Sequence, residues 1–193
     1  HSTKKRCCIK VKTGKLNRLQ NLEKHISKNL PKVDSKLDTR YINVNIHAIY
    51  NDDNQSEEVK EKLATIYRYN VESRKQTFNF YTDRAFKKNV NDIKQCACAF
   101  IQVEDLINED IIINKLAFRI LLDQSPETAE LAAILNVLLV LPKKSKVNIY
   151  TDAKNIIDKF NQWKNADFEI NARIYFKYKR HARIWNMIKG IIE

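Results

Sequence analysis

The chain has 193 residues, of which 44% are hydrophobic and 30% are charged, and its formal net charge is +12 at pH 7. This composition is typical of a globular protein and excludes a disordered tail. The longest apolar run, from Ala129 to Leu141, is too short to span a bilayer, which takes about 20 residues, so no membrane partner is expected. The excess of Lys and Arg favours polyanions such as nucleic acid, although a lysine-rich surface without any such partner would give the same charge.

Four cysteines occur as two close groups, Cys7-Cys8 and Cys96-Ala97-Cys98. Neighbours this close rarely form a disulfide with each other, and no signal peptide is visible. We therefore predict reduced thiols in an intracellular protein, with the nucleus and the cytoplasm both left open. The chain starts at His1 and its only methionine is Met187, which predicts a fragment or a processed piece.

Residues 1–76 are predicted to form an N-terminal region of unknown role. Leucine and isoleucine at steps of three and four predict an amphipathic helix over 14–30, which Pro31 ends. Alternating apolar and polar residues predict a strand over 41–50. A polar, acidic link is expected at 51–57, and a short helix around 58–68.

The second region, residues 77–193, has sharper patterns. Strands are expected at 78–83, 96–103, 115–122 and 147–152, and helices at about 126–141, 155–163 and 181–192. Ser125 is a plausible N-cap of the first of these helices, with Pro126 in its first turn, where proline is tolerated. Three strands in a meander, then a crossover helix and a fourth strand, indicate an α/β fold.

Two of the predicted strands carry almost the same motif. Phe78–Asp83 and Val147–Asp152 share the pattern Asn-(apolar)-Tyr-Thr-Asp. If the strands lie side by side and parallel, both carboxylates reach one end and one face of the sheet. Two like charges so close are unfavourable unless a cation holds them, which favours a metal site. The alternative for each Asp is that it starts a turn or caps a helix.

Glu130 is the third acidic residue that the pattern singles out. Its predicted helix is apolar nearly all round and should be largely buried. A carboxylate in such a helix is expected to be paired or to coordinate a metal. The alternative is an exposed Glu near a helix N-terminus, favoured by the helix dipole, and Glu127 fits that alternative better.

These three motifs, in this order, resemble the type 1 ribonuclease H family, which includes cellular enzymes and the domains attached to reverse transcriptases of retroelements. The resemblance covers about residues 77–193 and favours a retroelement source. It implies a ribonuclease H-like α/β fold with a mixed sheet, in which the first three strands are antiparallel and the fourth is parallel to the first. Helices are expected to pack on this sheet.

The resemblance also implies the chemistry. It makes Asp83, Glu130 and Asp152 both the catalytic and the metal-binding residues, holding two Mg²⁺ ions for which Mn²⁺ is a possible substitute. In the family these ions activate a water and stabilise the leaving oxygen during in-line attack on a phosphodiester. The implied hydrolase is an endonuclease for the RNA strand of an RNA–DNA hybrid, which is the implied partner. No small-molecule cofactor is expected.

A basic, aromatic stretch lies between Trp163 and Trp185. Cations interleaved with aromatic rings suit phosphate contact and base stacking, and some family members carry a basic handle near here. A helix with an apolar face and a solvated basic face would explain the same stretch. The residues expected to contact nucleic acid are Arg84, Lys154, Asn155, Lys177, Lys179, Arg180 and Arg183.

The sequence also departs from the family pattern. The family's Gly and Ser after the first Asp are Arg84 and Ala85 here, and Ala153 replaces its Ser after the fourth-strand Asp. Arg84 could compete with the cations. The fifth strand, the last helix and the fourth carboxylate of the family have no counterpart before Glu193, which predicts C-terminal truncation. The second hypothesis is therefore a degenerate module that binds nucleic acid without cutting it, and the third an interaction domain whose charge is incidental.

Overall fold

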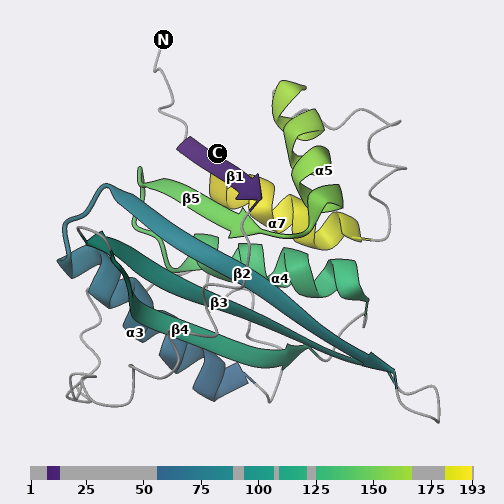
Figure 1. The fold of residues 1–193 in the computed structure, drawn as a ribbon, viewed down its shortest axis with the longest axis horizontal. Helices are drawn as coiled ribbons and strands as arrows, with labels where there is room; N and C mark the ends of the chain where they lie inside the picture. Colours follow the sequence, from purple (N-terminus) through teal and green to yellow (C-terminus); the bar gives the residue numbers. More distant parts are fainter. Residues whose placement is uncertain are drawn as a thin grey trace.

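The computed structural model describes residues 8–13, 56–88, 94–106, 109–120, 125–166 and 181–192 (Figure 1). Its elements are β1 (Cys8–Thr13), α3 (Ser56–Glu72), β2 (Thr77–Lys88), β3 (Lys94–Leu106), β4 (Glu109–Ile120), α4 (Pro126–Leu139), β5 (Lys146–Thr151), α5 (Lys154–Asn165) and α7 (Ala182–Ile192). Within these ranges, every helix is too short or too polar to cross a membrane. The helix predicted at 14–30 and the strand predicted at 41–50 lie outside them.

Five strands form one mixed sheet in the order β1-β5-β2-β3-β4 (Figure 1). β2, β3 and β4 form an antiparallel meander, and β5 pairs with β2 in parallel. This arrangement confirms the predicted fold, in which three antiparallel strands are joined by a fourth that is parallel to the first. Parallel pairing is possible because the chain crosses over through α4 before it returns as β5.

β1 is a strand that was not among the predicted elements. It pairs in parallel with β5, from Cys8 opposite Lys146 to Thr13 opposite Thr151. β5 therefore has a neighbour on both sides, which suits its buried residues Val147 and Ile149. β5 has the same length, but β1 lies in a basic, mixed stretch and lacks the repeated motif that marks β5 as a strand.

The core lies between the sheet and the helices packed on one of its faces. α4 contacts β2 and β3 on one side and α3, α5 and α7 on others. This surrounding explains why α4 is apolar nearly all round. The largest fully buried apolar side chains are Trp163, Phe80, Phe100, Leu63, Leu131, Leu139, Ile149, Ile156 and Ile188.

A chain of buried amides joins α3 to the rest of the core. Asn70 donates a hydrogen bond to the carbonyl of Val140 (2.8 Å) and accepts one from Gln102 (2.6 Å). Asn114 in turn donates to Gln102 (3.0 Å). Each of these three amides thereby has a hydrogen-bond partner, which burial favours. β1 and α3 both pack with the sheet, so parts of residues 1–76 contribute to it, while the predicted division of the chain near residue 77 stays a prediction.

Candidate active site

The two aspartates flank the point at which β2 and β5 separate. The parallel pairing of these strands ends at Tyr81 and Tyr150, whose rings stack with centroids 4.7 Å apart. Asp83 follows two residues later on β2, and Asp152 follows directly after the end of β5, so both carboxylates lie where the two strands separate. The prediction that both strands end at the aspartate is wrong for β2, because its pairing with β3 continues as far as Lys88.

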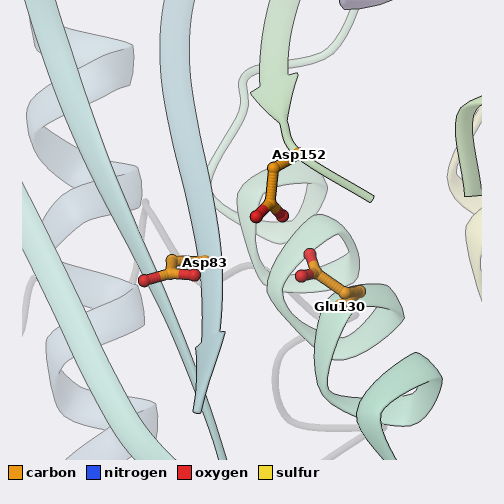
Figure 2. A group of neighbouring side chains, drawn as sticks. All are labelled: Asp83, Glu130 and Asp152. Atoms are coloured by element: carbon orange, nitrogen blue, oxygen red, sulfur yellow. The ribbon is translucent and has the colours of Figure 1, made fainter. Parts of the chain in front are cut away.

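Glu130 approaches the aspartates from the second turn of α4 (Figure 2). The N-cap, Ser125, fixes where this helix starts, because its hydroxyl accepts a hydrogen bond from the N–H of Thr128 (3.1 Å). One ligand oxygen from each of Asp83, Glu130 and Asp152 lies within 4.8 Å of the others. The structure thus brings together all three predicted acidic residues, from three different elements.

The carboxylate of Glu130 is buried, with 1% of the residue exposed. Thr151 donates a hydrogen bond to its Oε2 (3.2 Å), and Nε of Arg84 lies 3.1 Å from its Oε1. The pKa of Glu130 is raised to about 7, mainly by burial and also by the charges of Asp152 and Asp83, while the hydrogen bond from Thr151 and the charge of Arg84 act in the opposite direction. Glu130 is therefore much easier to protonate than an ordinary Glu.

The two aspartates are more accessible than Glu130. Asp83 is half-buried, and its Oδ1 accepts a hydrogen bond from the backbone N–H of Arg84 (2.7 Å). Asp152 is exposed, and α5 has Ala153 as its N-cap residue, with no hydrogen bond from a capping side chain. The alternative of a helix cap therefore does not account for Asp152.

The donor set fits a hard divalent cation. Carboxylate oxygens are the ligands that Mg²⁺ and Mn²⁺ prefer, and three of them converge here. Oε1 of Glu130 is buried and accepts no hydrogen bond of adequate geometry within the described part of the chain. Its contact is the charge of the Arg84 guanidinium, and a cation between the carboxylates would supply a direct ligand bond to this buried oxygen.

The residues predicted to contact nucleic acid are only partly described. Lys154 and Asn155 open α5 just after Asp152, and both are exposed. Arg183 is exposed in the first turn of α7, and the side chain of Arg84 is 40% exposed. Lys177, Lys179 and Arg180 lie outside the described residues. A role in nucleic-acid binding stays a prediction for all seven.

Beside the carboxylates lies a second polar cluster that sequence reasoning does not assemble. Buried His181 hydrogen-bonds through Nε2 with the hydroxyl of Ser125 (3.2 Å), and its Nδ1 lies 3.5 Å from Oε1 of Glu127. Lys159 forms an ion pair with Glu127. The cluster ties the first turn of α4 to α5 and to the start of α7. Only the N-cap pattern at Ser125 signals it in the sequence, because the other contacts join distant segments.

Comparison with known proteins places these residues in a family. The RNase H family model matches residues 75–190, which is more than half of the chain and includes Asp83, Glu130 and Asp152. A search among curated protein sequences found no match.

Similar solved structures come from foamy viruses. A foamy viral protease-reverse transcriptase in complex with dsDNA is 20% identical over 59% of this chain and 72% of its own, with a TM-score of 0.44. The solution structure of the PFV RNase H domain is 19% identical over 59% of this chain and 70% of its own, with a TM-score of 0.46. A foamy viral protease-reverse transcriptase in complex with an RNA/DNA hybrid is 17% identical over 59% of this chain and 15% of its own, with a TM-score of 0.41. On the strength of the family match, the chain belongs to the RNase H family.

Proposed function

We propose that this chain is a metal-dependent ribonuclease H that cuts the RNA strand of RNA–DNA hybrids internally, with two divalent ions. The observation that carries the proposal is the convergence of Asp83, Glu130 and Asp152, within the family match, on ligand oxygens no more than 4.8 Å apart. Three acidic groups at this separation repel one another unless cations hold them. Mg²⁺ is the expected ion and Mn²⁺ a substitute.

The three carboxylates would hold the ions, which supply an activated water and neutralise the leaving oxygen when bound. The protein positions these carboxylates and controls their ionisation. Thr151 orients Glu130 through a hydrogen bond to Oε2, and the stacked tyrosines hold β2 and β5 together just before Asp83 and Asp152. Glu130, with a pKa of about 7, has to lose its proton before it can act as a ligand.

Binding of the hybrid is supported by charge and exposure. The net charge of +12 attracts a polyanion, because bound Lys and Arg release condensed counterions from the phosphates. Exposed Lys154 and Asn155 follow Asp152 with only Ala153 between, so they are suited to contact the backbone of the strand to be cut. Contacts to 2′-hydroxyls would distinguish RNA from DNA.

The experiment is cleavage of a labelled RNA–DNA hybrid in Mg²⁺ or Mn²⁺ by the wild type, by Asp83→Asn and by a matched control, Asp158→Asn. Asp158 is an exposed acid on α5 outside the carboxylate cluster. The proposal predicts metal-dependent cutting of the RNA strand that Asp83→Asn abolishes and Asp158→Asn keeps. Cutting that persists in Asp83→Asn at the wild-type rate would overturn it, as would the absence of both cutting and binding.

A second candidate function is a degenerate module that binds the hybrid without cutting it. The contact of Arg84 with Glu130 favours this candidate, because a cationic side chain lies where the family pattern has glycine. Salt-sensitive binding of the hybrid without cleavage in either metal would select this candidate over the nuclease.

A further inference from the structure

We propose that Arg84 is a resident cation of the carboxylate cluster, which neutralises Glu130 in the free protein and has to leave it before a second divalent ion is held. The free protein would then hold one ion, and withdrawal of Arg84 would open the second position. This inference rests on the proposed function in that it assumes the cluster binds divalent ions.

The geometry gives Arg84 two separate contacts with the cluster. Its Nε lies 3.1 Å from Oε1 of Glu130, and its backbone N–H donates a hydrogen bond to Oδ1 of Asp83 (2.7 Å). The first contact depends on the side chain, whereas the second would survive any substitution except proline. Replacing the side chain at position 84 should therefore free Glu130 without disturbing Asp83.

Strand alternation explains why the side chain reaches Glu130. Arg84 follows Phe80 and Thr82 at steps of two along β2, and both of these are buried on the face that packs against α4. Arg84 therefore extends from the α4 side of the sheet, where Glu130 lies. Asp83 and Asp152 are more accessible, so they remain available to a first ion.

The charges fit one ion better than two while Arg84 is in place. Three ionised carboxylates carry −3 and the guanidinium carries +1, which leaves −2 for the cluster as a whole. One divalent ion balances this charge, and a second would face the guanidinium at Glu130. If Arg84 withdraws while one ion is bound, the cluster carries −1 instead of zero, and a second cation becomes favourable there.

The Arg84 side chain can leave this contact toward solvent. It is 40% exposed, so water can solvate the guanidinium when it moves away, and a cation between the carboxylates would then take over the charge of buried Glu130. Arginine binds phosphate with two parallel hydrogen bonds, so a nucleic-acid backbone arriving at the cluster offers it a competing anion. If Arg84 leaves Glu130 to bind a phosphate of the hybrid, arrival of the hybrid opens the second metal position.

The test counts Mn²⁺ ions bound to the folded, full chain by calorimetry and by electron paramagnetic resonance of free Mn²⁺, without nucleic acid. We expect one ion for the wild type and for Arg84→Lys, and two for Arg84→Gln. The second ion should bind Arg84→Gln about tenfold more tightly than the wild type, a difference of about 1.4 kcal/mol. Arg119→Gln removes an exposed arginine of β4 and serves as the matched control, with one ion expected. Circular dichroism checks that each variant is folded.

Two ions bound with equal affinity by the wild type and by Arg84→Gln would overturn the inference. So would a folded Arg84→Gln that binds fewer ions than the wild type, since Arg84 would then help to build the site. Hybrid cleavage, measured in parallel, separates this inference from the proposed nuclease. If the wild type binds one ion, Arg84→Gln binds two and neither cleaves the hybrid, the resident cation is supported and the nuclease is rejected. If every variant binds two ions and cleaves the hybrid, the nuclease is supported and the resident cation is rejected.

Discussion

Tyr81 of β2 and Tyr150 of β5 stack with their ring planes 20° apart, at the last paired position of the two parallel strands. Beyond this pair the strands separate, and each reaches an acidic residue two positions later. The separation of Asp83 and Asp152 therefore depends on a contact that lies outside the carboxylate cluster itself. An aromatic pair of this kind contributes about 0.5–1.5 kcal/mol beyond the area it buries.

Replacing Tyr81 with alanine should lower both stability and metal affinity. Loss of the stacked ring is expected to reduce the free energy of unfolding by at least about 1 kcal/mol and to loosen the end of the strand pair. Urea unfolding and a Mn²⁺ titration measure the two effects. Tyr81→Phe keeps the stacked ring and should lose less stability and less metal affinity than Tyr81→Ala. Unchanged metal affinity in Tyr81→Ala would mean that the stack does not position the aspartates.

Thr151→Val should make Glu130 harder to ionise. Thr151 donates the hydrogen bond to Oε2 that lowers the pKa of Glu130, so without it that pKa should rise above about 7. A hydrogen bond to a charged group contributes about 1.5–3 kcal/mol, so we expect a rise of about one to two units. Mn²⁺ binding followed against pH should shift to higher pH by this amount. Thr151→Ser retains the hydroxyl and should not shift, and an unshifted Thr151→Val would contradict the assigned role.

Glu130→Gln should be most stabilising, relative to the wild type, at high pH and without metal. The pKa of Glu130 is about 7 in the folded chain against 4.5 ordinarily, so the folded state binds the proton more tightly between these values. Stability from this group is complete below about pH 4.5 and is lost as the pH rises through about 7, where the buried carboxyl ionises beside Asp83, Asp152 and Arg84.

Glutamine stays neutral at every pH, so the stability of Glu130→Gln should not fall as the pH rises through about 7. One pKa unit corresponds to about 1.4 kcal/mol, which sets an upper limit of about 3 kcal/mol on the gain at pH 8. Urea unfolding in EDTA at pH 5 and pH 8 measures this gain. If the difference in free energy of unfolding between Glu130→Gln and the wild type does not grow from pH 5 to pH 8, the raised pKa of Glu130 is contradicted. Saturating Mg²⁺ should reverse the order, because the ion stabilises the wild type.

The three acidic residues could be predicted from the sequence because a local pattern points to each of them. A repeated strand motif places Asp83 and Asp152, and an apolar helix makes Glu130 conspicuous. The strand β1 was not predictable in this way, since its partner β5 lies far along the chain and only tertiary contact selects it. The extension of β2 past Asp83 and the contacts of His181 with Ser125 and Glu127 are likewise decided by pairing partners, not by local propensity.

Ser125→Ala should destabilise the chain and impair the carboxylate cluster only indirectly. Ser125 caps α4 and hydrogen-bonds with His181, and loss of an N-cap reduces the free energy of unfolding by about 1 kcal/mol. The matched control is Thr65→Ala, an exposed hydroxyl within α3 that bonds only to the preceding turn. Thermal unfolding should separate the two variants. Stability of Ser125→Ala equal to that of Thr65→Ala would show that the cap and its histidine contact contribute nothing measurable.

Removal of residues 1–13 should expose β5 as an edge strand. β5 is buried on the side of α4 through Val147 and Ile149, and its outer backbone groups are paired by β1. An unpaired, apolar edge is a template for pairing with a second chain. We therefore expect a lower melting temperature and concentration-dependent association, measured by thermal unfolding and by light scattering after size exclusion. Removal of residues 1–7 leaves β1 in place and should have neither effect. If the longer deletion melts at the wild-type temperature and elutes with the wild-type mass, β1 is dispensable and the sheet is sufficient with β5 at its edge.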